Sequence, residues 1–370
     1  MVVGLLPAIR GGLGELARTG QHSRLIRGYL VPYARAFDRV DYFSYLHERL
    51  DDWTDDPEIR ARVRLHPGHG HPWVHTLLMP LRYRRELAAC AALRVFQVTG
   101  ALPAVIARRR WGVPFVTTYG FWYARLARSR GTAFLRAVVE RLGLRAASAV
   151  IVTTAELAAH VASRTDPAKI HLIPNGVDTR QFRPGARRVD GPRRILYVGR
   201  LSAEKNLGAV LEATAKVRGR VEAAVLFVGE GPERAALESQ ARALGVPFEV
   251  RPFVDHRRLP EVFGGADVFV LPSFTEGHPK VLLEAMACAL PCVASDVGGN
   301  RAILVDGETG VLVPPTDRAR LADALAQVLT EPGRADALGT RARAAIEASY
   351  DLERLVAAEI ALVRAIARSR

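Results

Sequence analysis

The sequence lacks the features that would place the chain in a membrane or in an oxidising compartment. Its apolar runs fall well short of the roughly 18–20 residues that a membrane-spanning helix needs. The apolar start, Val2 to Ile9, is too short for a signal peptide and has no basic residues before it. The three cysteines, Cys90, Cys288 and Cys292, form neither a disulfide framework nor a metal-ligand pattern. We therefore expect a cytoplasmic protein whose cysteines pack among apolar side chains.

Lysine is also scarce, because only four of the 52 basic residues are lysines. A preference for arginine over lysine is a bias that genome composition produces. The high isoelectric point therefore does not by itself predict a nucleic-acid partner, and we expect none. The charge is nevertheless uneven. Residues 1–175 hold 25 basic and 13 acidic residues, a net of +12, whereas the remainder holds 27 and 25, a net of +2. The basic first half predicts contact with an anionic acceptor or with the inner face of an anionic membrane.

What is present is enough for two globular domains. The chain has 370 residues, of which 49% are hydrophobic and 24% charged. From Arg194 onward, short apolar runs alternate with helical periodicity, as in Glu233–Leu244 and Arg320–Leu329. The expected strands are Ile195–Val198, Val225–Val228, Phe248–Arg251, Val268–Leu271, Cys292–Ala294 and Val311–Val313. This alternation predicts an α/β fold with a parallel sheet covered by helices.

The first half repeats the pattern less clearly. Its expected strands are Val2–Leu6, Val40–Phe43, Val95–Val98, Phe115–Thr118, Ala149–Val152 and Ile170–Ile173. The segment Asp178–Pro192 is rich in proline, glycine and arginine, which is typical of a linker. We therefore predict a first domain over residues 1–178 and a second over residues 179–351. The helical stretch 352–370 is expected to pack back on the first domain.

The most informative segment places two carboxylates eight positions apart, Glu276 and Glu284. Glu276 follows the expected strand Val268–Leu271 in a loop, and Pro279 suits the first turn of a helix that carries Glu284. The N–H groups of Gly277–Lys280 would then point into the space between the carboxylates. A helix N-terminus binds anions, and carboxylates accept hydrogen bonds from sugar hydroxyls. The pattern indicates a site for a nucleotide sugar.

A second candidate site follows the first strand of the second half. Gly199 at the strand end allows close approach of a ligand to the backbone, and Arg200 and Lys205 can converge on a diphosphate. The alternative is a solvated turn with ordinary surface cations. The position at the carboxyl end of a strand favours the binding site.

The glycine-rich segment after the first strand has two interpretations. Gly12-x-Gly14-x-x-Ala17 imitates a dinucleotide-binding fingerprint, but a single match of this kind is weak. We expect instead that Gly11 and Gly12 form a flexible loop facing the cleft between the domains.

Other candidates have structural alternatives of similar weight. Gly229 and Gly231 favour a turn, and Phe253 suits either a nucleobase or the core. Thr99-Gly100 and Tyr119-Gly120 could line the acceptor side or simply end strands. The histidines of segment 66–75 are separated by glycine and proline, so a mobile loop is favoured over a zinc site.

Taken in order, these segments resemble the family 4 retaining glycosyltransferases of GT-B architecture. The motifs that carry the resemblance are Ile173-Pro-Asn175-Gly176-Val-Asp178, Tyr197-Val-Gly199-Arg200-Leu, Phe227-Val-Gly229-Glu-Gly231-Pro, Glu276-Gly-His-Pro-Lys-Val-Leu-Leu-Glu284-Ala-Met-Ala-Cys, Pro291-Cys-Val-Ala, Gly298-Gly299, and Asp306-Gly-Glu-Thr-Gly310-Val-Leu-Val-Pro. The match is dense over about residues 170–315 and only general before that.

The resemblance implies two Rossmann-like domains that face each other across a cleft, with a UDP- or GDP-sugar bound by the second. Arg200 and Lys205 would hold the diphosphate and Glu276 the donor sugar, which makes these three the expected catalytic residues. Glu284 would bind the ribose. The remaining expected donor contacts are Gly11, Gly12, Gly199, Gly277, His278, Pro279, Lys280 and Val281. No metal or other cofactor is expected, because the two cations supply the positive charge.

Two positions depart from the family pattern. Family members often carry a glutamate where this chain has Ala302, which affects donor contacts. A histidine often follows the fourth strand of the first domain, where this chain reads Thr118-Tyr119-Gly120. Either Tyr119 replaces that histidine or the site differs.

The resemblance implies a hexosyltransferase of polysaccharide or glycolipid biosynthesis that acts on a glycan or lipid-linked acceptor. Three alternatives stay open. A nucleotide-sugar epimerase of the same architecture would need no acceptor. A non-catalytic partner subunit would be expected to have lost its charged motifs. An NAD-dependent oxidoreductase would need a clearer glycine fingerprint.

Overall fold

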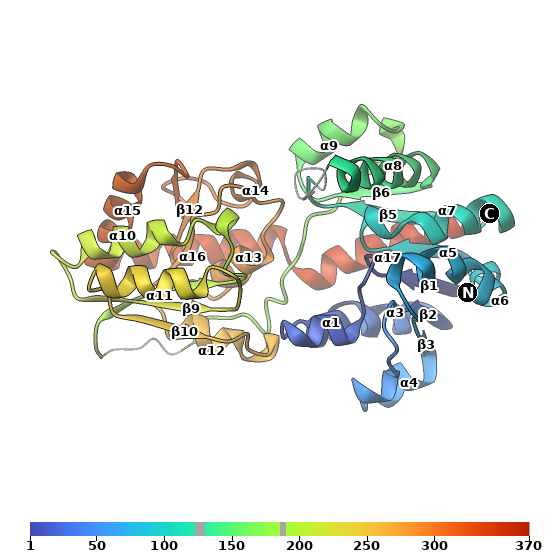
Figure 1. Cartoon of the computed structure of the whole chain (residues 1–370), viewed down its shortest axis with the longest axis horizontal. Coiled ribbons are helices and arrows are strands. Elements are labelled where there is room, and N and C mark those ends of the chain that lie inside the picture. The colour runs from blue at the N-terminus through green and yellow to red at the C-terminus, as the bar shows by residue number, and fades with distance from the viewer. Residues whose placement is uncertain (123–129, 186–189, 370) are drawn as a thin grey trace. The chain divides into compact units, whose positions relative to one another are not determined.

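The computed structural model describes residues 1–122, 130–185 and 190–369, and the chain forms two compact units (Figure 1). The first unit comprises Met1–Pro174 together with the C-terminal segment from Glu353, and the second comprises Asn175–Leu352. The division lies at 174/175, four residues before the predicted one. Each unit is a parallel sheet with helices packed on it, as expected for a Rossmann-like domain.

The first unit contains a sheet of seven strands in the order β3-β2-β1-β4-β5-β6-β7. Its strands are β1 (Val2–Leu6), β2 (Arg39–Phe43), β3 (Val63–His66), β4 (Ala92–Val95), β5 (Phe115–Tyr119), β6 (Ala149–Val152) and β7 (Ile170–Leu172). All neighbouring strands are parallel. The central strands are buried nearly throughout, which explains their continuous apolar runs.

Helices connect the strands of the first unit. They are α1 (Leu13–Arg18), α2 (His22–Leu25), α3 (Val31–Ala36), α4 (Pro57–Arg62), α5 (Pro72–Arg82), α6 (Arg84–Ala89), α7 (Leu102–Trp111), α8 (Arg130–Ala146) and α9 (Ala155–Ala162). The last helix of the chain, α17 (Leu352–Arg368), also belongs to this unit. A buried carboxylate on it, Glu359, accepts hydrogen bonds from the Tyr33 hydroxyl and from Arg94 on β4.

The second unit contains a sheet of six parallel strands in the order β10-β9-β8-β11-β12-β13. Its strands are β8 (Arg193–Val198), β9 (Ala223–Val228), β10 (Phe248–Arg251), β11 (Val268–Leu271), β12 (Cys292–Ser295) and β13 (Val311–Val313). Its helices are α10 (Gly208–Val217), α11 (Arg234–Ala243), α12 (Leu259–Gly264), α13 (Lys280–Ala287), α14 (Gly298–Arg301), α15 (Arg318–Thr330) and α16 (Pro332–Ser349). The three cysteines are buried and take part in no disulfide within the described residues, in agreement with the packing role predicted for them.

Each sheet has one switch point, where successive strands stop being added on one side of the first strand and continue on its other side. In the first unit it lies between β1 and β4, and in the second between β8 and β11. Ligands of open α/β sheets bind outside the carboxyl ends of the strands at such a switch point. The loops that leave these four strands are therefore where a site is expected.

Most of the predicted strands are confirmed, and three predictions are wrong. The fourth strand of the first unit is Ala92–Val95 rather than Val95–Val98, and β3 was not predicted. The expected linker also fails, because Phe182 lies fully buried in the core of the second unit. Part of that segment, residues 186–189, lies outside the described residues. Backbone oxygens of Thr179 and Phe182 accept hydrogen bonds from the Arg343 guanidinium, which fixes the segment to α16.

Among the helices of the described ranges, none combines the length and the apolar character that crossing a membrane would require.

Candidate functional site

The loops after β8 and β11 bring several predicted residues together in the second unit. Gly199 directly follows β8 and has a φ of 151°, a conformation that favours glycine. A Cβ atom on Gly229, at the end of β9, would collide with the backbone oxygen of Gly199. The two glycines therefore allow the strand ends to lie in direct contact. Phe253 lies beside the same glycine, 3.3 Å from the position of such a Cβ.

Lys205 and Glu276 form the centre of this arrangement. The Lys205 Nζ lies 2.6 Å from the Glu276 Oε1, and the two side chains are 17% and 9% exposed. Lys205 ends the short 3₁₀ turn Ala203–Lys205, and Asn206 after it has a φ of 53°. The Asn206 amide donates to the backbone oxygens of Pro272 and Pro315, so it ties the β8 loop to the β11 loop. This tie fixes the position of the ion pair.

Glu276 is also held by a buried network that the sequence did not reveal. The Ser273 hydroxyl donates to Glu276 Oε1 at 2.7 Å. The Ser295 hydroxyl donates to the Ser273 backbone oxygen, and the Asn300 amide donates to the Ser295 backbone oxygen at 2.8 Å. Ser273, Ser295 and Asn300 are fully buried. These buried polar groups therefore fix the orientation of the Glu276 carboxylate. Ser273 belongs to the motif that carries Glu276, but its residue type alone gave no indication of this contact.

The backbone between Glu276 and α13 runs close to a second glycine-rich segment. A Cβ on Gly299 would lie 2.5 Å from the Glu276 backbone oxygen and 2.6 Å from that of Gly277. Pro279 is the residue just before α13, and the helix begins at Lys280. The prediction that a helix starts here is confirmed. Lys280 and Val281 form its first turn, whose N–H groups have no partner within the helix.

His278 is buried beneath this turn rather than exposed on it. Its side chain packs beside the Tyr350 ring at a centroid distance of 5.6 Å. The Asn175 amide donates to the His278 backbone oxygen at 2.8 Å, which gives the asparagine of the Ile173–Asp178 motif a structural role. Burial, assisted by the charge of Lys280, lowers the pKa of His278 to about 3. The imidazole is therefore neutral at physiological pH, and its Nδ1 has no hydrogen-bond partner.

Glu284 has a partner that the sequence analysis did not predict. Its Oε1 lies 2.9 Å from the Nε2 of His256, and both side chains are buried. The backbone oxygen of His256 in turn accepts from the Gln181 amide. Glu284 is thus buried on α13, one helix turn after the half-buried Lys280. Binding of ribose by Glu284 stays a prediction.

Arg200 differs from Lys205 in its surroundings. Its guanidinium is 67% exposed and lies 3.9 Å from Glu204, four residues later. Its backbone oxygen accepts a hydrogen bond from the buried Tyr197 hydroxyl. The structure fixes the backbone at Arg200 and leaves the side chain in solvent. The predicted convergence of Arg200 and Lys205 on one anion therefore stays a prediction.

The glycine loop of the first unit is held by a carboxylate. The N–H groups of Leu13 and Gly14 donate to the two oxygens of Glu48, at 3.0 and 2.8 Å. Ser44 donates to the same carboxylate. A Cβ on Gly12 would lie 2.7 Å from the Ser44 Oγ, so Gly12 is required for this packing. Gly11 N–H closes a turn onto the Ala8 oxygen at 2.8 Å. The loop follows β1, at the switch point of the sheet, and it is anchored by Glu48 rather than flexible as predicted. Sequence reasoning missed Glu48.

Other residues of the first unit that were candidates for a site have structural contacts. Tyr119 is buried, with its ring stacked on that of His160 at 5.7 Å. Gly100 ends the segment after β4, where a Cβ would lie 2.5 Å from the backbone oxygen of Pro7. Of the histidine-rich segment, His66 contacts Asp41 at 3.0 Å. Within the described residues, the structure contains no group of three or more potential metal ligands.

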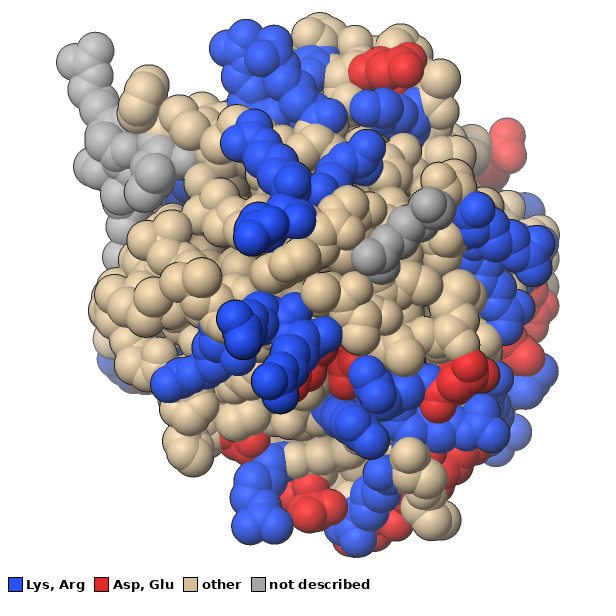
Figure 2. Space-filling model, turned by 90° about the vertical axis from the view of Figure 1, so that its right-hand side faces the viewer, with Lys and Arg blue, Asp and Glu red and all other residues tan. Residues whose placement is uncertain are grey.

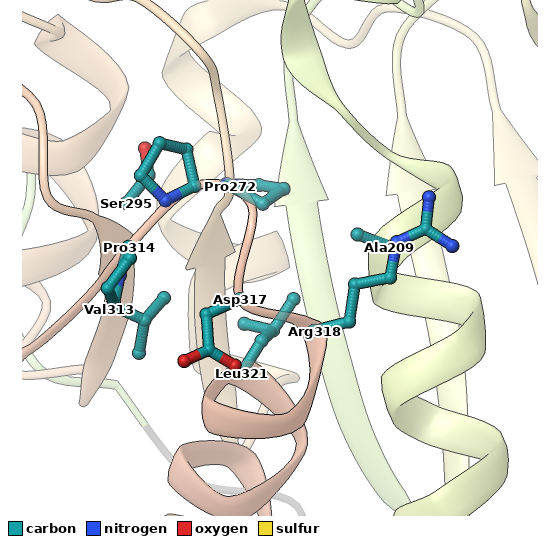
Figure 3. A pocket seen from close by; sticks show the side chains of 9 residues that line it. Ala209, Pro272, Ser295, Val313, Pro314, Asp317, Arg318 and Leu321 are labelled. Atoms are coloured by element: carbon teal, nitrogen blue, oxygen red, sulfur yellow. The ribbon is translucent and has the colours of Figure 1, made fainter.

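A small pocket lies beside the site at the carboxyl ends of β12 and β13 (Figure 3). It is lined by Ala209, Pro272, Ser295, Val313, Pro314, Pro315, Asp317, Arg318 and Leu321. Asp317 caps the N-terminus of α15, and Arg318 pairs with Glu212 on α10. The charged groups around this pocket are thus engaged in holding helices, and the pocket contains none of the predicted site residues.

Comparison with known proteins identifies the family. The model described as glycosyl transferases group 1 matches residues 178–345, and the model of glycosyltransferase family 4 matches residues 29–181. The chain therefore belongs to family 4 of the glycosyltransferases, with the GT-B fold. The predicted family and architecture are confirmed.

Curated relatives support this assignment. The chain is 34% identical over 282 residues to D-inositol 3-phosphate glycosyltransferase of Mycobacterium avium, a match that covers 70% of this chain and 66% of that protein. It is 36% identical over 196 residues to glycogen synthase of Mycobacterium tuberculosis, covering 52% and 47%. The chain thus spans a little less than two thirds of the length of the first relative and about half that of the second.

Solved structures show the same fold along the whole chain. Sucrose-phosphate synthase from Thermosynechococcus elongatus gives a TM-score of 0.84 at 22% identity and covers 100% of both chains. HepE from Anabaena, solved in complex with UDP, gives 0.78 at 17% identity and covers 99% of this chain and 100% of the other.

Proposed function

We propose that this protein transfers a sugar from a nucleotide diphosphate sugar to a hydroxyl group of a glycan or lipid-linked acceptor, with retention of the anomeric configuration. The observation that carries the proposal is the Lys205–Glu276 pair, held at 2.6 Å where the loops of β8 and β11 meet. It places a fixed cation and a fixed acceptor of hydrogen bonds side by side. A sugar linked to a diphosphate needs both.

In the proposed reaction, the bond between the anomeric carbon and the diphosphate oxygen breaks, and the departing diphosphate gains negative charge. Lys205 and the first turn of α13 would stabilise this charge more than they stabilise the bound donor. Arg200, whose side chain is exposed and pairs only at 3.9 Å with Glu204, would join them when the diphosphate is present. These groups supply the positive charge, so we propose that the reaction needs no metal.

Glu276 would accept hydrogen bonds from hydroxyl groups of the donor sugar. The carboxylate is oriented by Ser273 before any donor binds, so little reorganisation accompanies binding. The acceptor oxygen would attack the anomeric carbon on the side from which the diphosphate leaves. Its proton would pass to a phosphate oxygen of the leaving group. The products are then the glycosylated acceptor and the nucleoside diphosphate.

The names of the relatives suggest which substrates to test first. HepE was solved with UDP and with UDP-glucose, so UDP-sugars are the first donors to try. The Mycobacterium avium relative is named for a phosphorylated acceptor. The net charge of +12 over residues 1–175 fits an anionic acceptor of that general kind.

The proposal is tested by adding UDP-, GDP- and ADP-sugars and measuring thermal unfolding and donor hydrolysis. A ligand that binds only the folded chain at about 100 times its dissociation constant stabilises it by roughly 2.7 kcal/mol. We expect one nucleotide class to raise the melting temperature and to be hydrolysed slowly without acceptor. If no nucleotide sugar protects the protein, the proposal is wrong.

Product analysis separates the proposed activity from the alternatives. An epimerase would release an isomerised sugar without any acceptor. A non-catalytic subunit would bind the donor and leave it unchanged with every acceptor tried. The chain retains Lys205 and Glu276, whereas a non-catalytic subunit would be expected to have lost such charged groups.

A further inference from the structure

Helix α5 of the first unit has an apolar face that nothing in the described chain covers. Its inner face buries His75, Thr76, Met79 and Pro80. Its outer face consists of Val74, Leu77, Leu78 and Leu81, which are 52%, 59%, 50% and 72% exposed. A helix that is apolar on both sides normally lies inside a protein or in a membrane. The outer face is thus an exposed row at helical spacing, and scattered single hydrophobic residues do not produce such a row.

Basic residues follow this face directly. Arg82 ends α5, and Arg84 and Arg85 begin α6, all three of them exposed. Helix α7 packs against α5 and ends with the exposed Arg109 and Arg110. Helix α6 contacts both α5 and α7, so these arginines are carried by three mutually contacting helices, one of which bears the apolar face.

The stretch of sequence that contains these helices carries charge of almost entirely one sign. Between Ile59 and Val139 the sequence contains fourteen arginines and a single acidic residue, Glu86. Elements α5, α6 and α7 lie on the right in Figure 1, the side that faces the viewer in Figure 2. Figure 2 shows basic side chains that border areas of uncharged surface there, with acidic ones mainly in its lower part.

We propose that the α5 face, defined by Val74, Leu77, Leu78 and Leu81 with the adjoining Arg82, Arg84, Arg85, Arg109 and Arg110, docks the protein on a bilayer of anionic phospholipids. Helix α5 would lie parallel to the membrane surface, with its leucines among the upper acyl chains and the arginines at the lipid phosphates. This pairing of an apolar face with a basic flank is the composition of an interfacial helix.

A membrane fits this surface better than the other occupants do. In a symmetric dimer the same patch meets itself, so the arginines of two copies would approach one another and repel. A nucleic acid would pair with the arginines but would leave the four aliphatic side chains in water. An anionic bilayer satisfies both parts of the surface at once.

The test is sedimentation of the full chain with vesicles of phosphatidylcholine alone or of phosphatidylcholine mixed with phosphatidylglycerol, whose anionic headgroups give the surface a negative potential. We expect binding to the anionic vesicles that weakens as salt is raised, and little binding to the neutral ones. In the variant Leu77→Ser/Leu81→Ser, and separately in Arg84→Gln/Arg85→Gln, affinity should fall. The expected loss is about fivefold for each arginine removed.

Matched controls separate this effect from general changes of the surface. Val305→Ser removes an equally exposed apolar side chain from the second unit, and Arg242→Gln/Arg320→Gln removes two exposed arginines there. Both should bind vesicles like the unaltered protein. Melting temperatures confirm that each variant is folded.

The inference does not rest on the donor chemistry, because vesicle binding is measured without nucleotide and donor binding without vesicles. It is overturned if the unaltered protein ignores anionic vesicles, or if the α5 variants bind as well as the controls. Light scattering provides a further outcome. A dimer that the leucine variant converts to a monomer would show that a second copy occupies the face, and would also overturn the inference.

Discussion

Lys205 and Glu276 stand 71 positions apart in the chain and form an ion pair of 2.6 Å between the loops that leave β8 and β11. Neither loop holds the pair alone. The Asn206 amide joins the two loops, and Ser273 orients the carboxylate. The pair therefore depends on the order of strands in the sheet, which makes β8 and β11 neighbours.

The first prediction concerns the charge of Lys205. Replacing it by methionine removes a cation from the proposed diphosphate site, and we expect turnover to fall by about 10²- to 10³-fold. Because Lys205 is only 17% exposed, the loss should appear also as weaker binding of UDP. Lys216→Met is the matched control, since that lysine is exposed on α10. Steady-state kinetics and calorimetric titration measure the two effects, and a Lys205→Met variant with full turnover would remove the proposed role.

The second prediction separates structure from binding at Glu284. Glu284→Ala leaves the buried His256 without its partner, so we expect a loss of stability of about 1–3 kcal/mol. Glu284→Gln retains an oxygen that can accept from His256 and should be nearly as stable as the unaltered protein. If Glu284 also binds ribose, both variants should bind the donor less well. Urea unfolding and donor titration of the same samples check the two parts independently.

The third prediction is a pH dependence of stability that comes from His278. Burial lowers the pKa of this imidazole to about 3, whereas in the unfolded chain it titrates near its ordinary value of about 6.5. Between these values the unfolded chain binds the extra proton, so stability should fall as the pH drops below about 6.5. This one group contributes a slope of up to about 1.4 kcal/mol per pH unit.

His278→Phe keeps a ring beside Tyr350 and removes the titration. Its stability relative to the unaltered protein should therefore rise as the pH is lowered from 7.5 to 5. Urea unfolding at several pH values measures this difference. A constant difference across that range would show that His278 is not the group responsible.

The fourth prediction concerns the attachment of the C-terminal helix to the first unit. Arg94 on β4 and Glu359 on α17 form a buried ion pair of 2.8 Å, and burial with the Glu359 charge raises the pKa of the buried Tyr33 beside them. Removing one partner leaves a buried charge, which costs about 3–5 kcal/mol. We expect Arg94→Met and Glu359→Leu each to destabilise the protein strongly.

The double variant Arg94→Met/Glu359→Leu removes both charges and should recover a large part of this loss. The surface pair Arg234–Glu238 on α11 is the control, because an exposed pair contributes only about 0–1 kcal/mol. Urea denaturation of the unaltered protein, the two single variants and the double variant gives the coupling energy, for comparison with the control pair. Strictly additive losses would contradict the prediction.

The sequence predicted the elements of the second unit better than those of the first. Val268–Leu271 and Phe248–Arg251 are strands with the predicted bounds, because an apolar run between turn residues is a local signal. The fourth strand was placed three residues too late, since Ala92–Val95 contains Arg94, whose charge is neutralised by a residue 265 positions away. The segment around Phe182 resembled a linker because its glycines, prolines and arginines outweigh the one aromatic side chain that anchors it.

The sequence by itself determined the family, the two parallel sheets and the position of the site loops at strand ends. Each of these depends on short patterns of residues that lie close together in the chain. Only the tertiary structure decided which side chains meet. It paired Lys205 with Glu276 and Glu284 with His256, and it placed the Glu48 carboxylate on the glycine loop. Such pairings follow from strand order and packing, which bring distant segments together, and no local pattern records the partner of a charged group.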